Sequence, residues 1–118
     1  MQSACWELLR RRFASARVAH APYLLDAEVA SAARGLLLAR RLSAQRARQL
    51  VDDFAALRII RHPSGPLLHR VLQLRDNLTA YDACYVALAE ALKLPLLTLD
   101  AKIASAPTGA EVLVYPRA

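Results

Sequence analysis

Residues 79–92 read TAYDACYVALAEAL, and residues 95–100 read PLLTLD. The first segment predicts a helix that Thr79 caps, with Asp82 three residues later in capping-box register. The second predicts the strand Leu96–Leu99, and its unbroken apolar run indicates a strand that is buried on both sides. A helix followed by such a strand is typical of an α/β protein with a parallel sheet.

The rest of the chain adds further helices and strands in alternation. From hydrophobic spacing and turn residues we predict helices at Ser3–Ala16, Leu24–Leu42, Ser43–Leu57, Leu67–Arg75 and Ala101–Ala104, and strands at Arg17–His20, Arg58–Arg61 and Val112–Tyr115. No repeat or long linker interrupts this order. A chain of 118 residues is the size of one domain, so we expect a single α/β domain over residues 1–118.

The composition excludes several classes of protein. A hydrophobic share of 56% is typical of a globular chain and argues against disorder. No charge-free apolar run approaches the roughly 18–20 residues of a membrane span. Cys5 and Cys84 form no CxxC pair, which argues against a disulfide framework or a zinc finger. Without a secretory signal pattern, we expect the protein in the cytoplasm.

The charge is strongly basic. Sixteen basic residues face ten acidic ones, for a net charge of +6, and only Lys93 and Lys102 among the basic residues are lysines. The arginine bias is explained either by a GC-rich genome or by attraction to phosphate backbones. Charge alone does not decide between these two explanations.

Three acidic residues stand at positions where chemistry is expected. Asp100 directly follows a predicted buried strand, and ligands of parallel α/β sheets bind at the carboxyl ends of strands. Asp82 interrupts the apolar stripe of its helix, and Glu28 lies early in a helix beside small residues. Each has a simpler explanation: Asp100 as a helix cap, Asp82 as a capping-box acid, and Glu28 as an exposed surface residue.

If the three carboxylates meet, they need a cation. Clustered carboxylates repel one another unless a divalent ion neutralises them. Oxygen ligands without His or Cys select Mg²⁺ or Mn²⁺ rather than zinc. Such an ion characteristically acts on phosphates, and a basic surface would hold a nucleic-acid backbone. The residues therefore indicate a metal-dependent nuclease.

Three segments of the chain resemble a known family. They read RDNLTAYDACYVALAE at residues 75–90, LLTLDAK at residues 96–102 and HAPYLLDAEV at residues 20–29. This pattern resembles the PIN-domain ribonucleases, and most of all the VapC toxins of bacterial toxin–antitoxin pairs. The resemblance extends from about Ala19 to Tyr115 and implies a three-layer α/β/α fold with a short parallel sheet.

The resemblance also implies a site and partners. Glu28, Asp82 and Asp100 match the metal-binding carboxylates of the family, and Thr98 falls where the family often has a hydroxyl group. The family's activity is Mg²⁺-dependent endonucleolytic cleavage of RNA. Its members commonly form homodimers, and a cognate antitoxin silences them by covering the acidic site with its tail.

The beginning of the chain departs from the family pattern. PIN domains begin with a central strand that carries the first site aspartate, whereas residues 1–9 read MQSACWELL and resemble the helix that follows that strand. We therefore expect the first strand and one of four acids to be missing. Three interpretations are open: a shortened or misassigned start, a weaker site of three acids, or a degenerate, non-catalytic remnant that keeps only a surface for antitoxin binding or dimerisation. A further alternative is a basic RNA-binding module that uses arginines alone.

Overall fold

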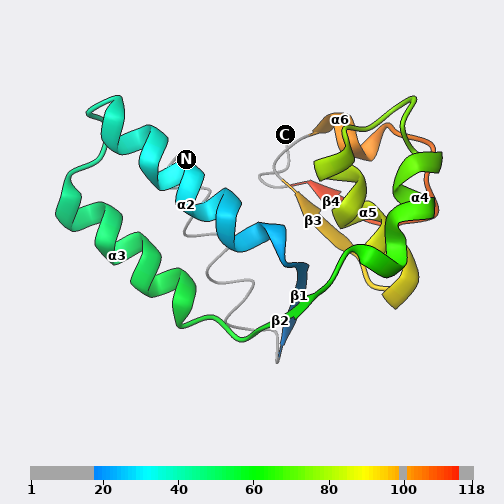
Figure 1. Cartoon of the computed structure of the whole chain (residues 1–118), viewed down its shortest axis with the longest axis horizontal. Helices are drawn as coiled ribbons and strands as arrows, with labels where there is room; N and C mark the ends of the chain where they lie inside the picture. Colours follow the sequence, from blue (N-terminus) through cyan, green and yellow to red (C-terminus); the bar gives the residue numbers. More distant parts are fainter. Residues whose placement is uncertain (1–17, 99–100, 115–118) are drawn as a thin grey trace.

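The computed structural model describes residues 18–98 and 101–114. These residues form an α/β arrangement in which short strands alternate with helices (Figure 1). The predicted fold class is therefore confirmed. None of the described helices is long and apolar enough to cross a membrane.

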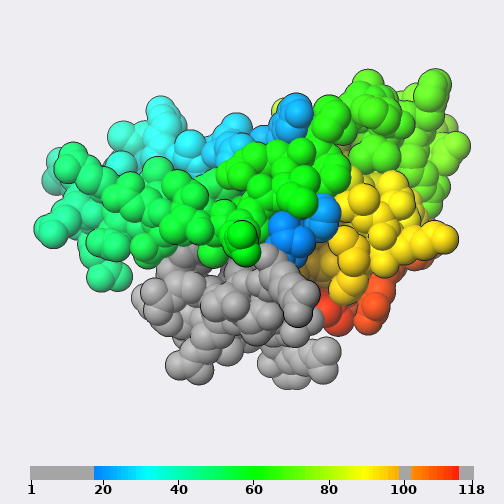
Figure 2. Space-filling view, turned by 90° about the horizontal axis from the view of Figure 1, so that it is seen from below, coloured from blue at the N-terminus to red at the C-terminus, as the bar shows by residue number. Residues whose placement is uncertain are grey.

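The first half of the described chain is a strand, a helical hairpin and a second strand. In order these are β1 (Ala19–Pro22), α2 (Leu24–Leu38), α3 (Ala44–Ala55) and β2 (Ile59–His62). Ser43 caps α3 by accepting a hydrogen bond from the backbone N–H of Arg46 at 3.1 Å, as the sequence predicted. The hairpin of α2 and α3 extends to one side of the molecule, away from α5 (Figures 1 and 2).

The second half is richer in short elements. It contains η1 (Gly65–Leu67), α4 (Leu68–Gln73), α5 (Ala80–Leu92), β3 (Leu96–Thr98), α6 (Ala101–Ala104) and β4 (Val112–Val114). Helix α5 ends at Lys93, which adopts the left-handed conformation with φ 55°. The N–H of the next residue, Leu94, donates to the carbonyl of Ala89 at 3.1 Å and closes the helix end.

The described strands form two parallel pairs. β1 lies beside β2, with His20 opposite Ile60, and β3 lies beside β4, with Leu97 opposite Leu113. Within residues 18–98 and 101–114 no hydrogen-bonded ladder joins the two pairs.

Helix α5 is the centre of the core. Its Ala83, Val86 and Ala87 are almost fully buried. They pack with buried residues of α4, α6 and the loop after α4, which are Val71, Leu74 and Ile103. Helix α5 also contacts both β1 and β3, so it packs against both strand pairs. Cys84 is buried and free in this helix, as expected of a small apolar residue.

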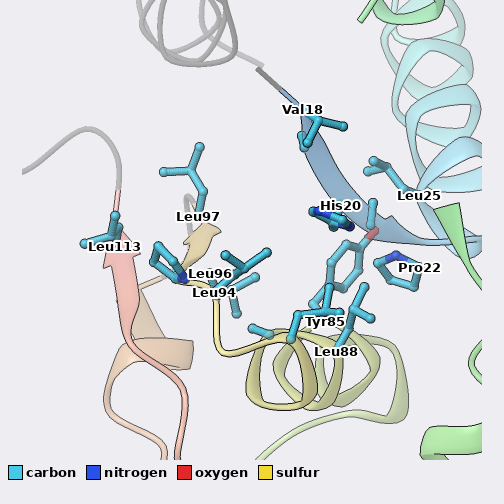
Figure 3. A pocket seen from close by; sticks show the side chains of 15 residues that line it. Val18, His20, Pro22, Leu25, Tyr85, Leu88, Leu94, Leu96, Leu97 and Leu113 are labelled. Carbon is cyan, nitrogen blue, oxygen red and sulfur yellow. The ribbon is translucent and has the colours of Figure 1, made fainter. Parts of the chain in front are cut away.

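Several boundaries differ from the predictions. The first two strands lie one or two residues later than predicted, at Ala19–Pro22 and Ile59–His62, and α2 ends at Leu38 rather than Leu42. The prediction that Leu96–Leu99 is buried on both sides was wrong for its described part, since β3 is only half-buried. The physical reason is that Leu96 and Leu97 line a hollow (Figure 3) and, among the residues that the structure describes, β3 pairs with β4 alone.

Candidate active site

The site is built first from the segment that leaves β1. The backbone N–H of Tyr23 donates to the carbonyl of His62 at 3.0 Å, so α2 begins directly at the carboxyl end of the β1–β2 pair. Asp26 accepts hydrogen bonds from Arg61 of β2 at 2.8 to 3.1 Å, which fixes the first turn of α2. Glu28 follows on α2 and is exposed. It therefore presents its carboxylate to solvent at the end of the strand pair.

The second carboxylate belongs to the first turn of α5. Thr79 caps this helix and accepts a hydrogen bond from the backbone N–H of Asp82 at 3.2 Å, as predicted. The cap fixes the backbone of Asp82, and its side chain is half-buried. The positive end of the helix dipole favours the negative charge there. The apolar stripe that Asp82 interrupts is real, because Val86 and Ala89 are buried.

Tyr85 connects Glu28 of α2 to α5, the helix that carries Asp82. Its hydroxyl group donates a hydrogen bond to Oε1 of Glu28, across 57 residues of sequence. Burial raises the pKa of the Tyr85 phenol far above its ordinary value, and the hydrogen bond and negative charge of Glu28 raise it further. The charge of Asp82, one helical turn before Tyr85, acts in the same direction as the last of these causes. Tyr85 thus stays protonated and acts as a donor.

The acids of this region fall into two kinds. Asp26 is paired with Arg61, and Glu90 with Arg70 at 2.7 Å, and these arginines hold the pKa of both carboxyl groups below the ordinary range. Within the described residues, neither Glu28 nor Asp82 forms an ion pair with an arginine or lysine. Carboxylate oxygens are the ligands that Mg²⁺ prefers, so these two acids are the described residues that could contribute to holding a divalent cation.

The third predicted acid, Asp100, lies outside the described residues and stays a prediction from the sequence. Thr98 is half-buried at the end of β3. Among the described residues no group of three His, Cys, Asp or Glu side chains is placed to hold a metal ion. The structure thus shows a contact of Glu28 with Tyr85, three residues after Asp82 on α5.

Two contacts of this region were not predicted from the sequence. One is the Tyr85–Glu28 hydrogen bond. The other joins His20 Nδ1 to His62 Nε2 at 2.9 Å across β1 and β2. The only signal in the sequence for Tyr85 is its position one helical turn after Asp82, on the same side of the helix.

Comparison with known proteins gives close relatives. Ribonuclease VapC1 of Mycobacterium tuberculosis is 47% identical over 91 residues, which cover 76% of this chain and 68% of the relative. Ribonuclease VapC9 of the same species is 38% identical over 91% of this chain and 85% of the relative. Ribonuclease VapC12 is 37% identical over 86% of this chain and 85% of the relative. No family model matches the chain.

The short parallel strands and the helix that supports them are those of a PIN-like α/β protein. Within that class, the three relatives are 37–47% identical to this chain over aligned stretches that cover most of its length. The chain belongs to the VapC ribonuclease family.

Proposed function

We propose that this protein is a Mg²⁺-dependent endoribonuclease and the toxin of a type II toxin–antitoxin pair, with Glu28, Asp82 and Asp100 as the metal ligands. The observation that carries the proposal is that Tyr85 joins Glu28 to the helix that carries Asp82, and that neither acid has an arginine or lysine partner among the described residues, while Asp26 and Glu90 have one each. The relatives named ribonuclease VapC support the activity.

The chain's own residues have distinct tasks in this proposal. The Tyr85 hydroxyl group occupies Oε1 of Glu28, which leaves Oε2 available to a cation. Thr79 fixes the backbone of Asp82 at the start of α5. When bound, Mg²⁺ or Mn²⁺ would supply polarisation of a water molecule and neutralisation of phosphate charge. Thr98 is proposed as a supporting hydroxyl group, and surface arginines would hold the RNA backbone.

The proposed partners follow from the same site. An antitoxin segment that covers Glu28 and Asp82 would block access of RNA to both carboxylates. A homodimer is proposed as the assembly state, from the family resemblance. Copurification with the antitoxin encoded beside this chain, followed by measurement of the mass of the complex, tests both partners.

Removal of one carboxylate tests the function directly. Asp82→Asn keeps the backbone hydrogen bond to Thr79 and the size of the side chain, so the fold should be retained. We expect RNA cleavage in Mg²⁺ to fall by at least about 100-fold, more than the loss typical of groups around the ligands. The parent should also lose cleavage in EDTA and recover it with Mg²⁺ or Mn²⁺.

The matched control is Asp52→Asn, which changes an exposed acid of α3. It should cleave RNA as the parent does. If Asp82→Asn cleaves at the rate of the parent, the site assignment is wrong. If the parent binds its antitoxin but cleaves no RNA under any metal condition, the chain is the non-catalytic remnant instead.

A further inference from the structure

The positive charge of the chain is concentrated in the helical hairpin of α2 and α3. Residues 29–51 contain five arginines and no acidic residue, so they supply five of the net six positive charges. The other eleven basic residues face all ten acids and are almost balanced by them. A bias in genome composition does not explain why acids are missing from one segment. The five residues, called the hairpin arginines below, are Arg34, Arg40, Arg41, Arg46 and Arg48.

The side chains of the hairpin arginines are open to a ligand. All five are exposed, and within residues 18–98 and 101–114 none of them forms an ion pair or a side-chain hydrogen bond. By contrast, Arg61 and Arg70 are each paired with a carboxylate. Figures 1 and 2 show the hairpin extending to one side of the molecule, away from α5. A large partner can therefore approach it.

Two of the hairpin arginines occupy positions where stability favours a different residue. Arg40 follows α2 in the left-handed conformation, with φ 57°, and this position at a helix end favours glycine. Arg46 is the third residue after the cap Ser43, where Glu or Gln would complete a capping box. The dipole of α3 also disfavours a positive charge there. Folding therefore gives no reason for an arginine at either position.

The charge and chemistry of the hairpin fit the phosphate backbone of a nucleic acid. Guanidinium groups bind phosphate oxygens through pairs of hydrogen bonds, and a strand offers an anion at every nucleotide. The proposed cleavage site has the opposite charge, since Glu28 and Asp82 repel phosphates when no cation is bound. Attraction for RNA must then come from other residues, and the hairpin carries it on the same helix as Glu28.

Helix α2 sets the distance between the site and the end of the hairpin. Glu28 lies in its second turn, and the helix ends at Leu38. These ten residues extend about 15 Å at a rise of about 1.5 Å per residue. A stacked strand has one phosphate about every 3.4 Å, so it covers this distance in about four nucleotides.

We propose that the hairpin arginines form a phosphate-binding surface that holds the RNA strand about four nucleotides away from the cleaved bond. The inference rests on the proposed function, because it places the cleaved bond at Glu28. RNA binding can be measured apart from cleavage, so a failure of this inference is distinguishable from a failure of the nuclease proposal.

The first test is the pair Arg40→Gly and Arg46→Gln in one chain. It removes two charges and gives each position a residue that the fold favours, so the midpoint of urea unfolding should not fall. Binding of a labelled twelve-nucleotide single-stranded RNA in EDTA should weaken by about tenfold or more at about 0.1 M salt. The slope of log affinity against log salt should fall by about 1.4, since each phosphate contact contributes about 0.7.

The matched control is the pair Lys93→Gly and Arg75→Gln. Lys93 ends α5 in the left-handed conformation with φ 55°, and both residues are exposed outside the hairpin. The control loses the same charge, and its RNA affinity should stay within about twofold of the parent. Equal weakening by the two pairs, or an unchanged RNA affinity in the hairpin pair, would overturn the inference. Arg41→Gln with Arg48→Gln is a second hairpin pair and should weaken binding as the first does.

Cleavage in Mg²⁺ gives a second readout. With the twelve-nucleotide RNA, the hairpin pair should raise KM by about tenfold and leave kcat within about twofold, because the arginines bind substrate and transition state equally. A four-nucleotide RNA is too short to reach from the site to the end of the hairpin, so its kcat/KM should not change. If no variant and no parent cleaves RNA, the nuclease proposal fails and the binding measurement alone decides this inference.

An acidic protein segment is the alternative partner for such a surface. A twelve-residue polyglutamate peptide tests it in the same titration. If the hairpin pair loses affinity for this peptide but binds RNA as the parent does, the surface serves an acidic protein and the inference is overturned.

Discussion

At the scale of single residues, the candidate site depends on a hydroxyl group that does not touch the proposed substrate. Tyr85 is half-buried on α5, and its donation to Glu28 joins a carboxylate of α2 to the helix that carries Asp82. Groups that orient ligands in this way are positioning residues, and their loss typically lowers metal affinity or activity by about 10–100-fold.

Tyr85→Phe isolates this role. It removes the hydroxyl group and keeps the ring, so we expect about tenfold weaker Mn²⁺ binding and about tenfold slower RNA cleavage, since the carboxylate of Glu28 loses its fixed orientation. Excess Mn²⁺ should restore much of the rate, which a merely destabilised fold would not show. Binding is measured by calorimetry and cleavage on labelled RNA.

The control is Tyr81→Phe on the same helix. Tyr81 is 68% exposed, and its loss of a hydroxyl group should change neither measurement. Equal metal affinity in Tyr85→Phe and the parent would show that the contact with Glu28 has no part in the site.

Whether a contact could be predicted depended on how many residues separate its two partners in the sequence. Thr79 and Asp82 are three residues apart, so helix geometry alone fixes their contact, and the prediction of the cap was confirmed. Tyr85 and Glu28 are 57 residues apart, and His20 and His62 are 42 apart. Their contacts depend on how α2 and β2 are placed against other elements, which spacing in the sequence does not contain.

At the scale of elements, one carboxylate holds three segments together. Glu90 of α5 accepts hydrogen bonds from Arg70 of α4 at 2.7 and 2.8 Å and from the backbone N–H of Gly109, before β4, at 2.7 Å. The side chain of Glu90 is only 16% exposed. The hydrogen bond with Arg70, more than any other cause, holds the pKa of Glu90 below its ordinary value of 4.5.

Glu90→Gln should lower the free energy of unfolding by about 1 kcal/mol at neutral pH, because the charge-assisted bonds become neutral ones. The carboxyl pKa is lower in the folded than in the unfolded chain, so its contribution is complete above the unfolded value and is lost as the pH falls through the folded one. The variant and the parent should therefore converge in acid. Urea unfolding at several pH values measures this.

Asp52→Asn serves as the comparison for Glu90→Gln, since Asp52 is an exposed acid of α3. It should differ from the parent by less than about 0.5 kcal/mol at every pH. A constant difference between Glu90→Gln and the parent from neutral to acid pH would contradict the assigned role of the ionised carboxylate.

Elements with strong local signals were predicted better than those defined by pairing. The helix after Thr79 was correct within a residue, because its cap and apolar stripe are both local. β1 and β2 were displaced by one or two residues, since their limits are set by the parallel register of Ala19 with Ile59. Burial of β3 was overestimated, because an apolar run does not show whether a neighbouring strand is present.

At the scale of the whole molecule, the excess of arginine predicts how RNA binding depends on salt concentration. With a net charge of +6, binding of RNA by Asp82→Asn should weaken as salt rises. If three or four phosphates of a single strand are neutralised, the association constant should fall by about 100- to 600-fold for each tenfold rise in salt. Filter binding in EDTA measures the affinity apart from cleavage. A flat salt dependence would instead attribute the arginines to genome composition.

The helical hairpin has a consequence for how the protein loses activity on heating. The buried residues of α2 and α3 are the alanines Ala33 and Ala47, whereas α5 buries six residues. Small side chains give little burial energy, so the hairpin should open in a local transition before the core around α5 unfolds. In hydrogen exchange, the amides of α3 should then exchange at least about 100-fold faster than those of α5. Equal protection of the two helices would show instead that the molecule unfolds as one unit. Since Glu28 lies on the hairpin, cleavage would cease at a temperature where most of the chain is still folded, and it would return on cooling.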